Sequence, residues 1–286
     1  MLEADIVGTI KKVSRRKKLP DGTLYQSISV EHTENLAKRF KVGGQHIEIK
    51  ALENDIVPER YARNMKTFSI EDQAILLRSK VCVVGLGGLG GTVVEILARC
   101  GIGTLALIDG DSFEDSNLNR QFLSTHHLLA APKVEAAAQR VRHINSSIVV
   151  QNYPEYLNRK NAKRLLKNSD VVVDCLDNVQ TRFILEETSK KAKIPLVSAA
   201  VAGISGHITT IFPQDRGLTL IYGEPNRLPP KGAETALGCL SPAVTLLASL
   251  ESAEVVKILL NRGATLRNRL LIVDLNDNTL AVLDLI

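Results

Sequence analysis

Short runs rich in valine and isoleucine alternate with segments of helical pattern from Lys80 onward, and this alternation strongly limits the fold. Such runs are typical of strands buried on both faces, because helices cover both sides of a parallel sheet. The expected strands are VCVVG, LALID, IVVQNY, VVVDCL and PLVSAA. We therefore predict an α/β fold, a Rossmann-like, mostly parallel sheet with helices on both faces.

The pattern changes after Gly203, where strands follow one another in sequence. GHITTIF, LLIVDL and TLAVLDL predict C-terminal antiparallel strands, since hairpin-like neighbours need no crossover helix. A long apolar helix is expected over residues 241–260, after an irregular Pro- and Gly-rich stretch over residues 213–238.

The N-terminal part reads differently from the rest. A chain of 286 residues fits one large domain with a small extension. YQSISV and HIEIKAL read as short strands and EHTENLAKRF as a helix, with little apolar material for a separate core. We expect residues 1–57 to form a small N-terminal α+β appendage of unassigned role, and residues 58–286 to form the main domain.

The charge is concentrated in one place. The net charge is +5, and six cations crowd into residues 11–18, which leaves the remainder close to neutral. Blocks of this kind are usually solvated and partly disordered, and the alternative is an arm that holds nucleic acid or an acidic protein. With aromatic residues at 4% and no tryptophan, the chain offers no stacking platform, so we expect no dedicated nucleic-acid binding.

The spacing of the cysteines and the hydropathy of the chain indicate the cellular compartment in which we expect the protein. Cys82, Cys100, Cys175 and Cys239 lie far apart without a CxxC pair, which argues against a disulfide framework and against a structural zinc site. No apolar run is long enough to span a bilayer, and the first residues lack the apolar core of a signal peptide. We expect a reduced, cytoplasmic protein that does not engage membranes.

A glycine-rich loop follows the first strand of the main domain and opens a helix. Gly85, Gly87 and Gly90 fit the GxGxxG pattern, with Gly88 between them, and such loops let backbone N–H groups approach phosphate. The next strand ends in Asp109, where a carboxylate can bind ribose hydroxyls. These features alone would also suit a dehydrogenase with a nicotinamide cofactor.

The residues beyond Asp109 favour another chemistry. DGDSFEDSNLNRQF and the later APK gather cations, amides and one acid past the edge of the second strand. Hydride transfer has no use for such a set, whereas cleavage of a phosphoanhydride needs fixed cations for the departing pyrophosphate. The residues concerned are Asp111, Asn117, Arg120, Gln121 and Lys133.

Two further acids end the fourth strand of the main domain. DCLDN places Asp174 and Asp177 at the same carboxyl edge of the expected sheet. An acid cannot usefully contact polyphosphate directly, so we expect this edge to hold Mg²⁺.

The ordered motifs ERYARN, VVGLGGLG, DGDSFEDSNLNRQF with PK, and DCLDN with TR make the chain from about Glu59 onward resemble the ThiF/MoeB/HesA family. These proteins are adenylating relatives of ubiquitin-activating enzymes. The resemblance implies that ATP and a C-terminal carboxylate yield an acyl-adenylate and pyrophosphate. It also implies a partner, the Gly-Gly tail of a ubiquitin-like sulfur carrier in thiamine, molybdopterin or related biosynthesis.

The resemblance assigns roles to individual residues. Asp109 would bind the ribose, Asp177 would place Mg²⁺, and Arg63 would complete the ATP site of the other subunit in a homodimer. No general base is needed, because a C-terminal carboxylate is ionised at pH 7. The phosphates would be held by Asn117, Arg120 and Lys133, with Asp111, Gln121 and the glycine loop completing the nucleotide site.

The chain also departs from the family. Many relatives carry two CxxC pairs that bind zinc, and LTLIYGEPNRLPPKG stands where the first would be, so we expect ATP and Mg²⁺ but no zinc. Cys239 falls near a position where some relatives keep a cysteine that forms a covalent adduct. It begins an apolar helix, so it has either a catalytic role with a lowered pKa or only a packing role.

Other functions stay open at this point. The chain could be a catalytically weak, nucleotide-binding dimeric scaffold that recruits a partner through its N-terminal part. Within the adenylating class, the substrate could instead be a small-molecule or tRNA-attached carboxylate.

Overall fold

The computed structural model describes residues 2–225 and 234–286. Part of the stretch over residues 213–238, predicted to be irregular, therefore lies outside the described residues. Two short helices border the gap, α9 (Thr219–Tyr222) and α10 (Glu234–Leu237). Within the described ranges, no helix combines the length and the apolar character that crossing a membrane requires.

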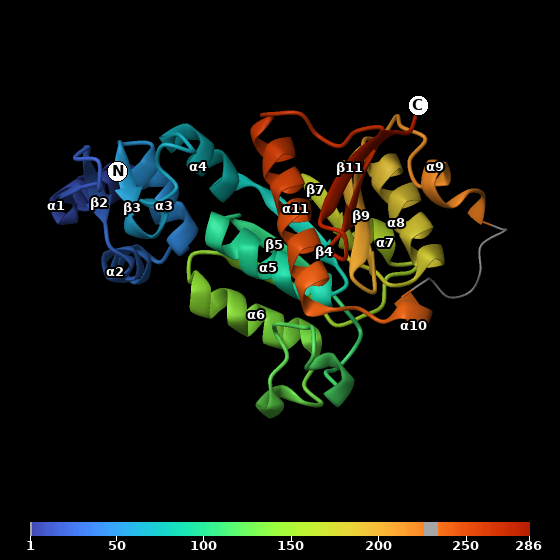
Figure 1. Ribbon diagram of the computed structural model, residues 1–286. Helices are drawn as coiled ribbons and strands as arrows, with labels where there is room; N and C mark the ends of the chain where they lie inside the picture. The colour runs from blue at the N-terminus through green and yellow to red at the C-terminus, as the bar shows by residue number, and fades with distance from the viewer. Residues whose placement is uncertain (1, 226–233) are drawn as a thin grey trace.

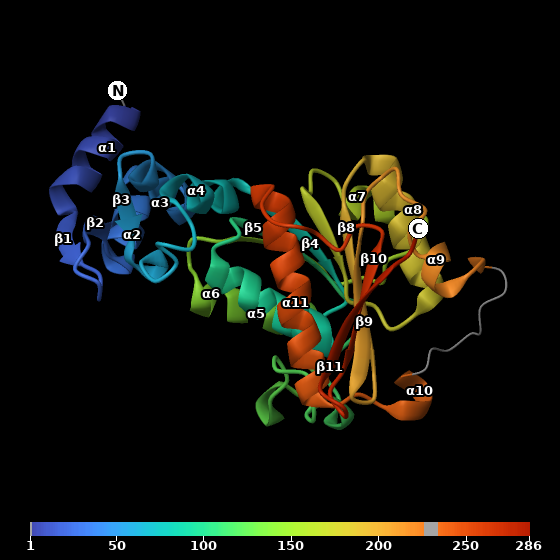
Figure 2. The same ribbon diagram turned by 45° about the horizontal axis from the view of Figure 1, so that its top comes forward.

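The main body is built on one eight-stranded sheet with the order β11-β10-β9-β8-β7-β4-β5-β6 (Figures 1 and 2). The strands from β4 to β8 run parallel to their neighbours, and β9 to β11 are antiparallel. The predicted fold class is thereby confirmed. The strands are β4 (Lys80–Val84), β5 (Thr104–Ile108), β6 (Val149–Tyr153), β7 (Val171–Asp174), β8 (Leu196–Ala202), β9 (Ser205–Ile211), β10 (Arg269–Asp274) and β11 (Thr279–Asp284).

Helices cover both faces of this sheet, as the buried strands require. On one face α5 (Gly88–Cys100), α6 (Lys133–Ile144) and α11 (Ser241–Leu260) pack over a core that includes Val93, Val141 and Leu247. On the other face α7 (Ala162–Leu165) and α8 (Val179–Ala192) enclose a second core around Leu165 and Leu185.

The register of the strands determines which strand ends lie next to one another. Val84 lies opposite both Ile108 and Asp174, so the carboxyl ends of β4, β5 and β7 are level. Polar residues that follow these three strands consequently emerge side by side at one rim of the sheet.

The N-terminal module, residues 2–58, differs from the sequence expectation in two ways. HIEIKAL belongs to a helix, because Ile47, Ala51 and Leu52 are buried on one helical face, and the basic run is ordered. Its elements are α1 (Leu2–Val13), β1 (Arg15–Lys18), β2 (Leu24–Ile28), α2 (Val30–Phe40), α3 (Gly44–Leu52) and β3 (Ile56–Pro58).

The module also has more apolar core than its composition indicated. Ile6 and Ile10, one turn apart on α1, are fully buried with Ile28 and Ile47. The many charged residues at and after the end of α1 make the amphipathic pattern of this helix hard to recognise in the sequence. Beyond the module, α4 (Ile70–Arg78) is preceded by Ser69, which forms a capping box with Asp72.

A buried polar network joins the module to the main body. The Glu48 carboxylate of α3 is fully buried, forms an ion pair with Arg60 at 3.1 Å and accepts a hydrogen bond from the Tyr61 hydroxyl at 3.1 Å. Asn145, directly after α6, donates to the Tyr61 hydroxyl at 2.8 Å and accepts from Arg60. Since a buried charge is costly unless paired, this network fixes how the module sits on the body.

Candidate functional site

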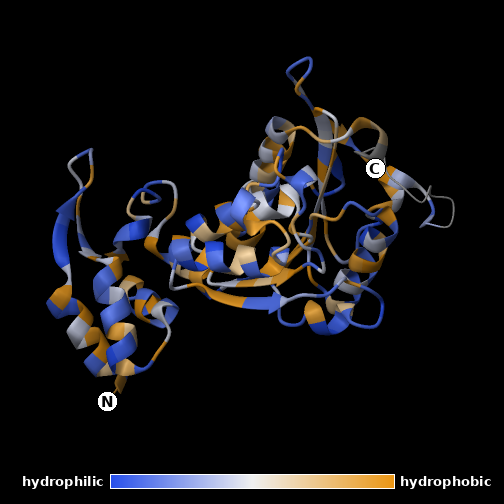
Figure 3. Cartoon of the chain, turned by 90° about the horizontal axis from the view of Figure 1, so that it is seen from below, coloured by the Kyte–Doolittle hydropathy of each residue, from blue (hydrophilic) through white to orange (hydrophobic). Residues whose placement is uncertain are grey.

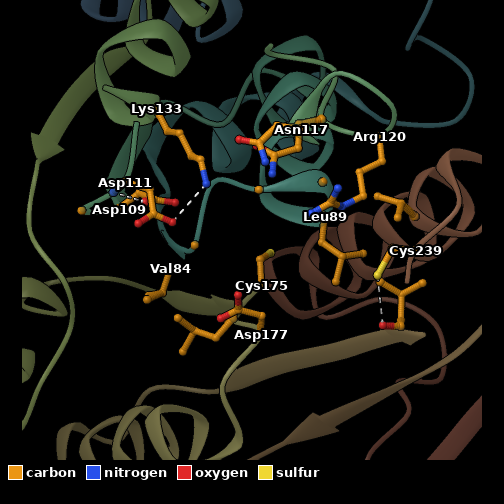
Figure 4. A pocket seen from close by; sticks show the side chains of 18 of the residues that line it. Val84, Leu89, Asp109, Asp111, Asn117, Arg120, Lys133, Cys175, Asp177 and Cys239 are labelled. Atoms are coloured by element: carbon orange, nitrogen blue, oxygen red, sulfur yellow. Dashed lines mark hydrogen bonds and ion pairs between the residues drawn. The ribbon is translucent and has the colours of Figure 1, made fainter. Parts of the chain in front are cut away.

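A cavity of about 810 Å³ opens at the carboxyl ends of the parallel strands (Figure 4). It lies where the predicted chemistry-bearing segments meet, although they are far apart in sequence. Arg182 and Tyr156, which sequence reasoning missed, line it too. The predicted site residues that line it are Gly85, Gly87, Gly88, Asp109, Asp111, Asn117, Arg120, Gln121, Lys133, Asp177 and Cys239.

The glycine loop packs tightly between β4 and α5. Gly85 has a φ of +90°, and a Cβ there would lie 2.6 Å from the Cys175 carbonyl oxygen. A Cβ on Gly90 would lie 1.8 Å from the Gly85 carbonyl oxygen, so Gly90 supports the loop from beneath. Gly87 caps α5 without a side-chain hydrogen bond, which leaves the first backbone N–H groups of the helix to an anion.

Asp109 is held directly beside this loop. Its carboxylate accepts hydrogen bonds from the backbone N–H of Leu86 at 2.6 Å and of Asp111 at 2.7 Å. Burial raises the pKa of Asp109, while the two backbone hydrogen bonds act in the opposite direction. The side chain is thus fixed at the rim of β5, in position to accept hydroxyl groups from a ligand.

Asp111 organises two of its neighbours. Lys133, the buried first residue of α6, lies 3.1 Å from one carboxylate oxygen, and the Tyr156 hydroxyl donates to the other at 2.5 Å. Although burial works to raise it, these two hydrogen bonds keep the pKa of Asp111 below its usual range. Tyr156 lies in the loop that follows β6. The only feature of the sequence that could have identified it as a site residue is that an aromatic residue stands just after an expected strand.

The segment before α6 brings amides and an arginine to the cavity. Asn117 ends a 3-10 turn and accepts a hydrogen bond from the backbone N–H of Glu114 at 3.1 Å, so it also shapes the turn. Arg120 donates to the Ser116 carbonyl at 2.8 Å and faces the cavity. Gln121 is buried next to Gly87, and among the described residues its side-chain oxygen has no hydrogen-bond partner.

The two acids at the end of β7 have different environments, although both lie at the same end of the strand. Asp174 is fully buried, forms an ion pair with Arg182 at 3.2 Å and accepts from Ser198 at 2.7 Å. As the last residue of β7, Asp174 points into the packed body instead of the cavity. Burial raises its pKa, and the Arg182 charge opposes this.

Asp177, in contrast, lies in the loop beyond the strand and lines the cavity. Within the described ranges, no hydrogen-bond donor or cation pairs with its exposed carboxylate. One unpaired carboxylate facing a phosphate-sized space is the donor set that Mg²⁺ accepts, since this ion keeps several waters and takes phosphate oxygens. The described residues include no cluster of His, Cys, Asp or Glu able to hold a metal without such a ligand.

The two cysteines that line the cavity also differ. Cys175 donates its thiol to Glu251 at 3.6 Å, and burial raises its pKa well above the usual range, so it is not a nucleophile. Cys239 lies two residues before α11, half-buried, and its thiol donates to the Val201 carbonyl at 3.6 Å. Figure 4 shows Cys239 on the opposite wall from Asp111.

Arg63 is the predicted site residue that the structure leaves outside. It is exposed and does not belong to the described lining of the cavity. Burial and Glu59 raise the pKa of Tyr25, and the charges of Lys17 and Arg63 oppose the shift, so Arg63 lies on the module side near β2.

Three cations from the described ranges line the cavity, Arg120, Lys133 and Arg182, of which Arg182 is paired with Asp174. A helix N-terminus and one unpaired carboxylate face the same space. Arg120, Lys133 and the first N–H groups of α5 can neutralise a polyphosphate, and Asp109 can hold the attached sugar. The arrangement is suited to a nucleoside triphosphate whose phosphoanhydride is cleaved.

Comparison with known proteins agrees with this interpretation of the cavity. The ThiF family matches residues 61–285. The chain is 35% identical over 226 residues to a SAMP-activating enzyme E1 from Haloferax volcanii, covering 77% of this chain and 83% of that protein. It is 33% identical over 239 residues to an adenylyltransferase and sulfurtransferase MOCS3 from Arabidopsis thaliana, covering 81% of this chain and 51%, about half, of that protein.

Solved structures resemble the fold at lower identity. E. coli MccB crystallised with ATP is 21% identical with a TM-score of 0.67, covering 90% of this chain and 79% of that one. PaaA, solved with selenomethionine, is 23% identical with a TM-score of 0.66, covering 80% of this chain and 82% of that one.

Proposed function

Because the chain belongs to the ThiF family, we propose that it uses ATP to adenylate a C-terminal carboxylate, releasing pyrophosphate. It is an adenylyltransferase of the ThiF type. The observation that carries this proposal is the convergence of Arg120, Lys133 and Asp177 on one cavity beside the N-terminus of α5. The names of the relatives, an activating enzyme and an adenylyltransferase, support the same activity.

The proposed substrate is the Gly-Gly tail of a ubiquitin-like sulfur-carrier protein. A tail of this kind has no side chains to obstruct its approach to the α-phosphate. The carboxylate and the phosphate are both anions, so their encounter is repulsive until cations screen it. Lys133 and Arg120 supply fixed positive charge, and the charge on the leaving pyrophosphate is stabilised by the same groups.

Each residue has a limited task in this proposal. Asp109 orients the ribose, and Lys133 exchanges its contact with Asp111 for phosphate oxygens. Asp177 would hold Mg²⁺, which when bound would neutralise phosphate charge. The carboxylate needs no deprotonation, because its pKa lies far below neutral pH.

We further propose that the catalytic unit is a homodimer in which Arg63 serves the site of the other subunit. Its position outside the cavity of its own chain supports this role. An arginine supplied across a two-fold axis would complete both sites at once. We propose a reducing, cytoplasmic setting as well, which the four free cysteines support. The absence of a structural zinc stays a prediction for elemental analysis.

Exchange of labelled pyrophosphate into ATP tests the activity. We expect exchange with a ubiquitin-like protein ending in Gly-Gly, and none with the same protein carrying a C-terminal amide, since the amide cannot attack. Exchange with a small-molecule carboxylic acid alone, or with a tRNA that bears a free carboxylate alone, would redirect the proposal to those substrates. Nucleotide binding without exchange on any carboxylate would instead support a scaffold.

Cys239→Ala is expected to retain pyrophosphate exchange. Adenylation uses no thiol, and the Cys239 thiol is engaged with the Val201 carbonyl at the cavity wall. The measurement compares exchange rates of the variant and the unmodified protein at saturating ATP. Loss of exchange in a variant with an unchanged melting temperature would place Cys239 in the adenylation step itself.

A further inference from the structure

The N-terminal module has no role in the proposed chemistry. It precedes the residues that the ThiF family matches, and the Glu48 network seats it firmly on the body. A rigidly held module with its own core can present a surface in a fixed orientation. The strand β1 lies at the outer edge of the sheet in this module.

β1 is the open edge of the three-stranded sheet β1-β2-β3. The opposite edge, β3, is buried at every residue, whereas β1 is exposed at every residue. Figure 2 shows β1 on the outer side of the module. Its outward backbone N–H and C=O groups can pair with another strand. The sheet can therefore be extended only at β1.

All four residues of β1 are cationic, and Figure 3 shows the strand as hydrophilic along its length. Within the described ranges only Lys17 has an ion-pair partner, Glu59 at 2.9 Å. The hairpin that carries β1 is fixed at its tip, where Lys66 lies 2.8 Å from Asp21 and donates to Thr23 at 3.0 Å. The charges of Arg15, Arg16 and Lys18 thus lie unneutralised on an ordered strand.

We propose that β1 is a docking site for an extended, acidic segment of a partner polypeptide, which adds to the sheet as a fourth strand. Main-chain hydrogen bonds to the edge would supply affinity, and acidic side chains opposite the cations would supply selectivity. Side chains of an added strand alternate between the two faces, as those of β1 do. An acidic strand therefore meets Arg15 on one face and Arg16 on the other.

The same features disfavour two other occupants. A second copy of the chain would place β1 against β1, with like charges directly opposite, which is destabilising. A nucleic acid is held mainly through its phosphates, and each phosphate contact calls for a cation on the same surface. The alternation of β1 leaves only Arg15 and Lys17 on one face, and Lys17 is already paired with Glu59.

The test uses the full chain and a short synthetic peptide in which pairs of glutamates alternate with pairs of threonines, which puts carboxylates on both faces of an extended strand, with both ends blocked. The blocked peptide has no carboxyl terminus to adenylate, so its binding is independent of the proposed reaction. We expect Arg15→Glu with Arg16→Glu to weaken binding by at least about tenfold at low salt. The matched control, Lys38→Glu with Arg39→Glu on α2, should stay within about twofold.

Peptide N-methylation separates strand addition from simple charge attraction. A peptide methylated at every backbone amide keeps its charge and loses the donors of both of its edges, so we expect its binding to fall by at least about tenfold. Equal weakening by the control pair, or undiminished binding of the methylated peptide, would overturn the proposal. So would tighter binding of a short RNA that competes with the peptide. Pyrophosphate exchange should be the same in the Arg15 and Arg16 variants as in the unmodified protein.

Discussion

Asp177→Ala is expected to lower the rate of ATP–pyrophosphate exchange by about 10²–10³-fold, the cost of losing one charge-stabilising group at a reacting phosphate. Asp177 lines the cavity, and within the described part of the chain no donor pairs with its carboxylate, so its removal leaves the surrounding contacts intact. The loss should appear in catalysis with an unchanged melting temperature. The measurement is exchange as a function of magnesium concentration.

Two further variants test whether the loss depends on the charge of Asp177 in particular. Asp177→Asn keeps the size and removes the charge, and it should be as defective as Asp177→Ala. Asp277→Ala, an exposed acid in the turn between β10 and β11, should exchange normally. A near-normal rate in Asp177→Ala would refute the assignment of this residue to Mg²⁺.

Mixing two inactive variants should restore activity. Arg63→Ala and Asp177→Ala damage different subunits of one site if Arg63 acts across the dimer. After random exchange half of the dimers are mixed, and each contains one intact site, so roughly a quarter of the unmodified activity should return. The readout is pyrophosphate exchange before and after subunit exchange.

The matched control mixes Asp177→Ala with Lys133→Ala. Both residues line the cavity of their own chain, so every mixed dimer would have two damaged sites and no activity should return. Recovery in this control would mean that the site is shared differently. Lack of recovery with Arg63→Ala, once exchange of subunits is demonstrated, would mean that Arg63 acts within its own subunit or has no catalytic role.

Most of the candidate site followed from the sequence because of topology. Parallel strands end at one edge, so Asp109 after β5 and Asp177 after β7 meet in space although they lie far apart in the chain. Strand length alone cannot say which way a terminal side chain points. The sequence placed Asp174 and Asp177 at the same edge but could not show that Asp174 is buried, since its burial against Arg182 depends on α8 packing beneath the strand.

The module was harder to predict for a different reason. Its segments are short, and HIEIKAL alternates well enough for a strand while its buried residues also fit a helix. Only packing against Ile28 and Ile56 decides between them. Tyr156 was missed because a loop residue has no periodicity to reveal it, and its contact with Asp111 exists only in three dimensions.

Helix α6 connects the two halves of the molecule mechanically. It begins at Lys133 in the cavity and ends directly before Asn145 in the network that seats the module. Its 12 residues make a strut of about 18 Å. A helix of this length behaves as a stiff rod, so tilting the seat of the module would move the ammonium group that faces the phosphates.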